Sequence, residues 1–203
     1  MNHPTDLNEF SAEAFATQRV SFEDDMAVFI LSRAIDQVLQ SASGRDIVIV
    51  CVGTDRSTGD AFGPIVGSKL SGLKSVRVYG SLEEPVHAVN LAATLEQIRC
   101  ANFRNPFILA IDACLGKFDH VGQIIIERGP LRPGAGVKKS LPEFGDYTIT
   151  GVVNVSGFME YFVLQNTRLN VVMKMSDIVV EALKGSLRRY YTRQRLVSTS
   201  EYP

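Results

Sequence analysis

A short apolar run followed by a polar loop and a helix places the strongest constraint on the fold. Residues 46–52 are almost wholly apolar and rich in β-branched side chains, which is typical of a strand buried on both faces of an α/β protein. A polar loop follows over residues 53–60, and Pro64 then occurs where the first turn of a helix tolerates a missing N–H. This order places the loop at the carboxyl end of a strand, where open α/β sheets bind their ligands. We therefore expect residues 53–60 to form part of a functional site.

The rest of the chain alternates between strand-like and helix-like patterns. Apolar residues at helical spacing predict helices over residues 22–39, 85–98, 158–164 and 170–193. Short apolar or alternating runs predict strands over residues 75–79, 107–111, 123–127 and 147–153. This alternation predicts a three-layer α/β/α sandwich with a mainly parallel sheet. We expect one or two antiparallel strands within residues 120–153.

The length of 203 residues suits one compact domain. We expect a flexible N-terminal arm over residues 1–21, a single α/β/α domain over residues 22–195 and a C-terminal tail over residues 196–203. The formal net charge of −1 gives no global reason to expect binding to nucleic acid or to an anionic membrane. No apolar run approaches the roughly 20 residues that cross a bilayer, and the N-terminus lacks the order of a secretion signal. These features predict a cytoplasmic protein.

Two aspartates are the strongest candidates for chemistry. Asp60 and Asp112 each come after a predicted buried strand, and two neighbouring parallel strands would bring them to one edge of the sheet. If the carboxylates lie close together, one retains a proton, and the pair can activate water against a peptide carbonyl. The same pair could instead bind a divalent metal that lowers the pKa of a bound water. A third interpretation is that Asp60 only caps the next helix and Asp112 only a turn.

Other catalytic patterns find little support. The histidines lack metal-motif spacing, His87 and His120 are interpreted as surface or interfacial residues, and the odd number of cysteines favours buried free thiols. These residues are His3, His87, His120, Cys51, Cys100 and Cys114. Neither a Gly-x-Ser-x-Gly motif nor a Walker lysine occurs. A basic loop that contains Arg132, Lys138 and Lys139 could steer an acidic substrate toward the site.

Several motifs together resemble one known family. They are Gly53-Thr-Asp-Arg-Ser-Thr-Gly-Asp-Ala-Phe-Gly-Pro64, Ile111-Asp112-Ala113 and Arg132-Pro-Gly-Ala-Gly-Val-Lys-Lys139. In these segments the chain resembles the sporulation protein YyaC family, which is related to the germination (spore) protease and, more distantly, to hydrogenase maturation endopeptidases. The resemblance covers residues 46–164. It implies a phosphorylase/hydrolase-like α/β/α fold and a peptidase-like domain.

The resemblance also implies roles for individual residues. In the spore protease two aspartates are the proposed catalytic residues, and Asp60 and Asp112 match them. A Pro-Gly-x-Gly-Val stretch of that enzyme is similar to Pro133-Gly-Ala-Gly-Val137. The spore protease degrades the small acid-soluble proteins that coat spore DNA. The resemblance therefore implies a peptide substrate and a role in the cytoplasm of a sporulating cell or spore.

The hydrogenase maturation endopeptidases differ at one position. They carry acidic residues at the positions of Asp60 and Asp112 and bind nickel with the help of a histidine, where this chain has Asn154. An amide is a poorer ligand than imidazole for such a metal. The difference favours an aspartate pair without a resident cofactor, although a divalent metal at Asp60 and Asp112 remains an alternative.

The sequence thus predicts a peptidase in which Asp60 and Asp112 activate water. The residues expected to contact or orient the substrate are Asn154, Asp55, Arg56, Thr54 and Arg132. Two alternatives remain open, namely a non-catalytic module that binds a peptide or partner on the same fold and a metal-dependent hydrolase.

Overall fold

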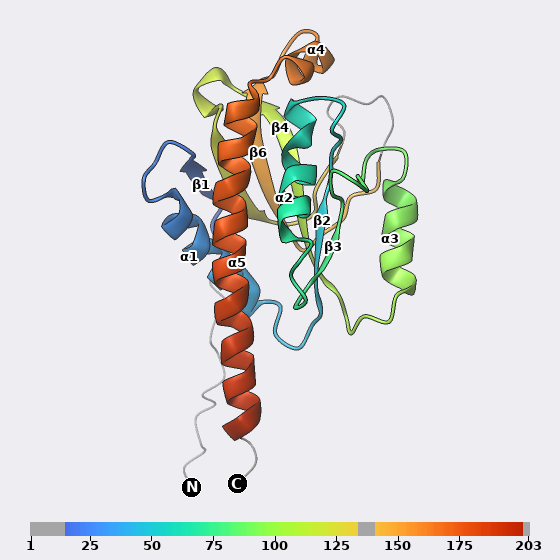
Figure 1. Cartoon of the computed structure of the whole chain (residues 1–203), viewed down its shortest axis with the longest axis vertical. Coiled ribbons are helices and arrows are strands. Elements are labelled where there is room, and N and C mark those ends of the chain that lie inside the picture. Colours follow the sequence, from blue (N-terminus) through green and yellow to red (C-terminus); the bar gives the residue numbers. More distant parts are fainter. Residues whose placement is uncertain (1–14, 134–140, 201–203) are drawn as a thin grey trace, which may run out of the picture.

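A six-stranded mixed sheet forms the centre of the fold (Figure 1). The computed structural model describes residues 15–133 and 141–200, with side chains up to Leu196. The strands are β1 (Gln18–Ser21), β2 (Ile47–Cys51), β3 (Arg77–Tyr79), β4 (Phe107–Gly116), β5 (Gln123–Arg128) and β6 (Tyr147–Val155), in the spatial order β1-β5-β6-β4-β2-β3. Strands β3, β2, β4 and β6 run parallel, whereas β5 is antiparallel to both β6 and β1. The mainly parallel sheet is confirmed.

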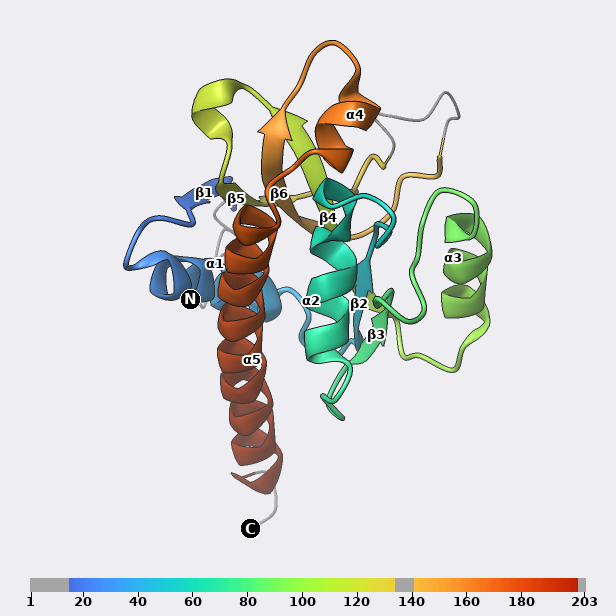
Figure 2. The same cartoon turned by 45° about the horizontal axis from the view of Figure 1, so that its top comes forward.

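Helices cover both faces of this sheet and complete a three-layer α/β/α sandwich (Figures 1 and 2). The helices are α1 (Ala27–Gln40), α2 (Phe62–Leu70), α3 (Leu91–Cys100), α4 (Glu160–Gln165) and α5 (Leu169–Ser200), with short 3-10 turns η1 (Gly59–Ala61) and η2 (Phe118–His120). Helices α1, α2 and α5 share one hydrophobic core with the sheet, and α3 shares a second core on the opposite face. Within the described residues, none of the helices has the length and hydropathy that a membrane span requires.

Strand β2 explains why the sandwich forms around this part of the chain. All five of its residues are buried. Ile47 and Ile49 contribute to the core under α1, α2 and α5, while Val48 and Val50 contribute to the core under α3. An uninterrupted apolar run satisfies both faces of a central parallel strand. The predicted burial on both faces is confirmed.

Both ends of the predicted domain need correction. Gln18–Ser21 lies in the predicted flexible arm but forms β1, whose backbone pairs with β5 from Gln18↔Ile126 to Ser21↔Gln123. Four residues are too few to show a periodic pattern, so only the presence of β5 reveals this strand.

Helix α5 continues to Ser200, into the predicted tail, because extending an existing helix adds a hydrogen bond for each residue fixed. Residues 1–14 of the predicted arm lie outside the described residues.

Two helices begin later than their apolar patterns predict. Helix α1 begins at Ala27 rather than at residue 22, because the N–H of Met26 donates to Asp24 Oδ1 (2.8 Å) in a turn before the helix. Helix α3 begins at Leu91 rather than at residue 85. The segment before α3 instead places Val86 beside Val52 in a parallel bridge. This second difference matters because it brings residues 86–88 to the carboxyl edge of the sheet.

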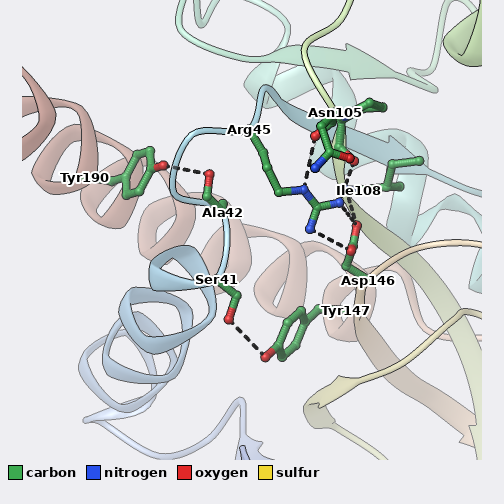
Figure 3. A network of polar contacts seen from close by, with 9 residues as sticks. Ser41, Ala42, Arg45, Asn105, Ile108, Asp146, Tyr147 and Tyr190 are labelled. Carbon is green, nitrogen blue, oxygen red and sulfur yellow. Dashed lines mark hydrogen bonds and ion pairs between the residues drawn. The ribbon is translucent and has the colours of Figure 1, made fainter. Parts of the chain in front are cut away.

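A polar network at the opposite edge of the sheet ties three segments together (Figure 3). The guanidinium of Arg45 donates to Asp146 Oδ1 (2.9 Å) and Oδ2 (3.1 Å) and to the carbonyl oxygens of Asn105 (3.1 Å) and Pro106 (2.7 Å). Asp146 Oδ2 also accepts from the N–H of Ile108 (2.8 Å). Arg45 and Asp146 are 22% and 31% exposed, so they lie in a partly desolvated environment. The network fixes the starts of β2, β4 and β6 relative to one another.

We expect the Asp146→Ala substitution to lower the free energy of unfolding by about 2–4 kcal/mol, because it leaves a half-buried guanidinium and the Ile108 N–H without their acceptor. Denaturant titration followed by circular dichroism measures the change. The control is Asp177→Ala, which removes an exposed ion pair with Lys69 and should change stability by no more than about 1 kcal/mol. Equal effects of the two substitutions would contradict this role of the network.

Candidate active site

The loop after β2 folds back on itself and presents Asp60. The N–H of Gly53 donates to the carbonyl oxygen of Val86 (2.8 Å), and the N–H of Thr54 donates to the carbonyl oxygen of Asp60 (3.1 Å). Gly53 has φ = +143°, and a Cβ there would lie 2.0 Å from the Asp60 carbonyl oxygen. A residue without a side chain is therefore needed at position 53. The closed loop places Asp60 in η1, immediately before α2.

Asp60 does not act as a side-chain cap. The N-cap residues are Thr58 for η1 and Ala61 for α2, and neither helix start has a side-chain capping bond. Burial raises the pKa of Asp60. The nearby Ser57 hydroxyl opposes this rise, although the buried Ser57 Oγ makes no hydrogen bond of normal geometry among the described residues. The partial positive charge at the start of α2 favours the ionised form of Asp60.

Asp112 lies within β4 rather than after it. The predicted strand ends at residue 111, but β4 continues to Gly116 because β6 pairs with it as far as Val155, with a register shift between Cys114 and Leu115. Strand β2 is shorter, and its last residue, Cys51, pairs with Ile111. Asp112 is therefore level with the point where the loop to Asp60 begins. This difference in strand length brings the two aspartates to the same place.

Asp112 is held in an environment that favours its neutral form. Its Oδ1 accepts a hydrogen bond from the N–H of Ala113 (2.8 Å). Burial raises the pKa of Asp112 to about 8, the Ala113 N–H opposes this rise, and the negative charge of Asp60 adds to it. The side chain is partly accessible to solvent because it faces a cavity. Near neutral pH the pair therefore combines a protonated Asp112 with a more acidic Asp60.

Both aspartates line one cavity of about 250 Å³. Its walls come from the end of β2 and the loop after it, the segment before α3, β4, the segment after β5, and α4. The lining residues are Val52, Gly53, Thr54, Asp60, His87, Ala88, Asp112, Ala113, Cys114, Leu115, Pro133, Leu141, Glu160, Tyr161 and Leu164. Apolar walls around a few carboxyl groups, here Asp60, Asp112 and Glu160, are typical of a small-ligand or substrate site.

The substrate residues predicted from sequence divide into two groups. Thr54 lines the cavity with the aspartates. Asp55 and Arg56 are exposed and lie outside the lining. Arg132 is also outside the lining and pairs with Glu143 (3.1 Å) in an exposed contact. Of the predicted Pro-Gly-x-Gly-Val motif, Pro133 lines the cavity, whereas residues 134–140, including Lys138 and Lys139, lie outside the described part of the chain.

Asn154 lies in β6 and makes local contacts rather than lining the cavity. Its Nδ2 donates to the carbonyl oxygen of Val163 and to Thr167 Oγ1 (both 3.2 Å), and its Oδ1 accepts from the N–H of Val155 (2.9 Å). These bonds fasten β6 to α4 and to the turn that follows α4. Asn154 thus supports the cavity wall from behind.

The side chains do not fit the nickel site implied by the hydrogenase maturation endopeptidases. That site needs a third ligand beside Asp60 and Asp112, and the amide of Asn154 is engaged elsewhere. Across residues 15–133 and 141–200, no group of three or more His, Cys, Asp or Glu side chains is arranged to hold a metal ion.

Sequence reasoning missed two polar residues of the cavity. The sequence predicts a surface or interfacial histidine at position 87, but His87 follows Val86 at the carboxyl edge of the sheet and lines the cavity. Its Nδ1 accepts from the N–H of Val89 (3.3 Å), which in the neutral ring leaves the proton on Nε2. Glu160 begins α4, and its Oε1 accepts from the N–H of Gly157 (3.3 Å). Two signals were available in the sequence, namely Pro85 shortly before His87 and Asn154, at the position of the family histidine, shortly before Glu160.

Cys114 lines the cavity without the properties of a nucleophile. Burial, followed by the charge of Asp112, raises the pKa of its thiol to about 11. The thiolate form is the reactive one, and it is scarce at neutral pH with this pKa. The acid–base chemistry of the cavity therefore depends on its carboxyl groups and on His87.

Comparisons with known proteins show what the fold and the sequence of this chain resemble. Among solved structures, a [NiFe] hydrogenase maturation protease, HycI from Thermococcus kodakarensis KOD1, is similar to this chain with a TM-score of 0.51 and 19% sequence identity, covering 74% of this chain and 99% of that protein. At this identity the likeness concerns the fold, and the predicted α/β/α architecture with a mainly parallel sheet is confirmed.

A bacterial relative has a much higher sequence identity to this chain than HycI has. The chain is 50% identical over 189 residues to "Uncharacterized protein YyaC" of Bacillus subtilis (strain 168), which covers 92% of both proteins. The family model described as "Protein of unknown function (DUF1256)" matches residues 19–182. The chain therefore belongs to the DUF1256 family, together with YyaC of Bacillus subtilis.

Proposed function

We propose that this protein is a peptidase that hydrolyses peptide bonds with the Asp60 and Asp112 pair. One observation carries the proposal: two carboxyl groups of different acidity line the same small cavity, and the charge of Asp60 raises the pKa of Asp112. Peptide hydrolysis needs a base to activate water and an acid to protonate the substrate. The likeness of the fold to HycI, which is named a protease, supports the same class of reaction.

In the proposed mechanism the two carboxyl groups have opposite roles. The ionised Asp60 accepts a proton from water as the water oxygen attacks the peptide carbonyl carbon. Asp112 donates its proton to the carbonyl oxygen, which forms a tetrahedral intermediate. Collapse of this intermediate breaks the C–N bond, the proton taken up by Asp60 passes to the leaving amine, and the hydroxyl proton returns to Asp112. Both aspartates thereby recover their starting states.

The remaining cavity residues support binding and orientation in this proposal. The Thr54 side chain contacts the substrate from the loop that carries Asp60. Asp55, Arg56 and Arg132 contact the substrate only outside the cavity, because none of them lines it. Asn154 acts indirectly by holding α4, which supplies Glu160 and Tyr161 to the wall.

The biological setting belongs to the proposal as well. The motifs around Asp60, Asp112 and Pro133 resemble those of the germination protease. We therefore propose that the protein acts in the cytoplasm of a sporulating cell or spore, with small acid-soluble spore proteins as candidate substrates. Incubation of the purified protein with acid-soluble spore proteins and with a synthetic random peptide library, followed by mass spectrometry, tests this proposal. Defined new termini would support it, and intact substrates with both probes across the pH range would reject it.

The proposed mechanism predicts a bell-shaped dependence of kcat/KM on pH. Because Asp112 must be protonated, activity should fall as the pH rises through about 8, the pKa to which burial raises this carboxyl. Because Asp60 must be ionised, activity should also fall at acid pH, at a limb displaced upward from that of an ordinary aspartate. Stopped assays across the pH range measure both limbs. Activity that continues to rise above pH 9 would contradict the acid role of Asp112.

A second candidate is a non-catalytic peptide-binding module on the same fold. Large apolar side chains are exposed around α4, beside the cavity; they are Phe158, Met159, Tyr161 and Phe162. Exposed aromatic residues next to a cavity are typical of surfaces that bind proteins. Tight binding of a peptide without turnover at any pH would favour this function.

A further inference from the structure

A second cavity lies beside the candidate active site, along the outer edge of β3. It has a volume of about 1280 Å³ and lies between α2 and α3. Figures 1 and 2 show β3 between these two helices. Its walls include Ser68, Ser71, Tyr79, Thr94 and Gln97. We call this cavity the β3 groove.

The floor of the β3 groove is an unpaired sheet edge. Within residues 15–133 and 141–200, strand β3 pairs only with β2, from Val48↔Arg77 to Val50↔Tyr79, and it is the last strand in the sheet order. Among the described residues, its outward backbone groups have no hydrogen-bond partner. Such an edge is a template for another extended chain, which gains backbone hydrogen bonds by adding a strand.

The β3 groove leads to the two aspartates. Val50 of β2 pairs with Tyr79, and two residues later Val52 pairs with Val86. Val86 therefore continues the line of β3 toward the carboxyl edge of the sheet. The next residue, His87, lines both the β3 groove and the cavity of Asp60 and Asp112. An extended chain that follows β3 in this direction reaches the active site past His87.

Charged side chains of opposite sign line different parts of the β3 groove. Glu83 and Glu84 line it and come shortly before His87 in the chain, whereas Arg77 lines it at the start of β3. The described residues supply no ion-pair partner for any of these three side chains. A basic residue in the bound chain would complement the two glutamates near the active site.

We propose that the substrate binds in the β3 groove as an extended peptide segment that adds a strand to β3 and carries a basic residue opposite Glu83 and Glu84. His87 marks the passage from this groove to the acid pair, where its Nε2–H can donate to the peptide backbone. The cleavage step rests on the proposed peptidase function, whereas the binding of a peptide strand does not depend on it.

The first test blocks the groove without touching the acid pair. Gln97 is exposed on α3 and lines the β3 groove. For the best-cleaved peptide of the random library, we expect Gln97→Trp to lower kcat/KM by at least about tenfold. The matched control is Ala92→Trp on the same helix, where residue 92 is exposed and outside the groove, and it should leave kcat/KM unchanged. Equal effects of the two variants would overturn the proposal.

The second test asks whether the peptide binds as a strand. Single N-methyl groups placed along the cleaved peptide remove one backbone donor at a time. We expect losses at every second residue on one side of the cleaved bond, because alternate residues of a strand point their N–H groups at its neighbour. A profile without this alternation would overturn the proposal while leaving peptidase activity intact.

A binding measurement separates the two proposals if no peptide is cleaved. Hydrogen exchange of the wild-type protein is recorded with and without the random peptide library at high concentration. Protection of the amides of Arg77–Tyr79 would support peptide binding in the β3 groove even if no peptide were cleaved and the proposed peptidase function had failed. Unchanged exchange in β3 would overturn the groove proposal, whether or not cleavage occurs.

Discussion

In the Asp112→Asn variant, peptide hydrolysis should fall by about 10²–10⁴-fold in kcat, the usual contribution of a positioned acid or base. Asparagine has nearly the same shape as a protonated aspartate and can still accept from the N–H of Ala113 through Oδ1. It has no carboxyl proton to transfer. Asp60→Asn should cause a loss of similar size, because it removes the base. Steady-state assays on the best-cleaved library peptide measure both effects.

The same Asp112→Asn substitution should make the folded protein more stable near neutral pH. The folded protein holds the Asp112 proton up to a pKa of about 8, whereas the unfolded chain releases it near the ordinary value of 3.8. The stability associated with this carboxyl is therefore fully present below pH 3.8 and is lost as the pH rises to about 8. Asparagine avoids this loss, so the variant should gain stability relative to the wild type across that window. Thermal unfolding at several pH values measures the gain.

Asp119→Asn is the matched control for the predicted effects of Asp112→Asn on activity and stability. Asp119 is a 76% exposed aspartate in η2, just beyond β4, and it is outside the cavity. Asp119→Asn should leave both kcat and the pH dependence of stability unchanged. If Asp112→Asn were less stable than the wild type near neutral pH, the raised pKa of the folded-state carboxyl would be contradicted, whereas an unchanged kcat would contradict its acid role.

The second large effect should come from Gly67→Ala, which we expect to lower the free energy of unfolding by about 1–3 kcal/mol or more. Gly67 lies inside α2, where alanine would normally favour the helix by about 1 kcal/mol. A Cβ at this position would lie 1.7 Å from the carbonyl oxygen of Gly80 and 3.3 Å from Cys51 Cβ. The clash with backbone outweighs the gain in helix propensity, because α2 must move away from the sheet to relieve it.

Gly72→Ala is the control for this effect. Gly72 follows α2 by two residues, and a Cβ there would meet nothing within 4 Å. Its φ is not in the left-handed region, so alanine is accommodated and should be neutral or slightly stabilising. Urea titration of both variants gives the comparison. A Gly67→Ala protein as stable as Gly72→Ala would contradict the close approach of α2 to the segment after β3.

The sequence by itself determined the architecture and the two best candidates for chemistry. The apolar run of β2 needs burial on both of its faces, between two layers of side chains. The alternation of strand and helix patterns along the chain then predicted an α/β/α sandwich with a mainly parallel sheet. Asp60 was recognisable because it lies in a polar loop after β2, and Asp112 because it follows an apolar run. Both signals are local, and the family motifs reinforced them.

Only the tertiary structure decided which other residues belong to the site. Strand β1, the length of β4 and the position of His87 depend on pairing with segments that are distant in the sequence. Asn154 was singled out by the family resemblance, yet its amide is used by neighbouring backbone and Thr167. Hydrogen-bond partners and burial are set by what packs around a residue. For this reason the sequence singled out Asp60 and Asp112 as candidates, whereas the fold determined the cavity that they share and the burial that raises the pKa of each.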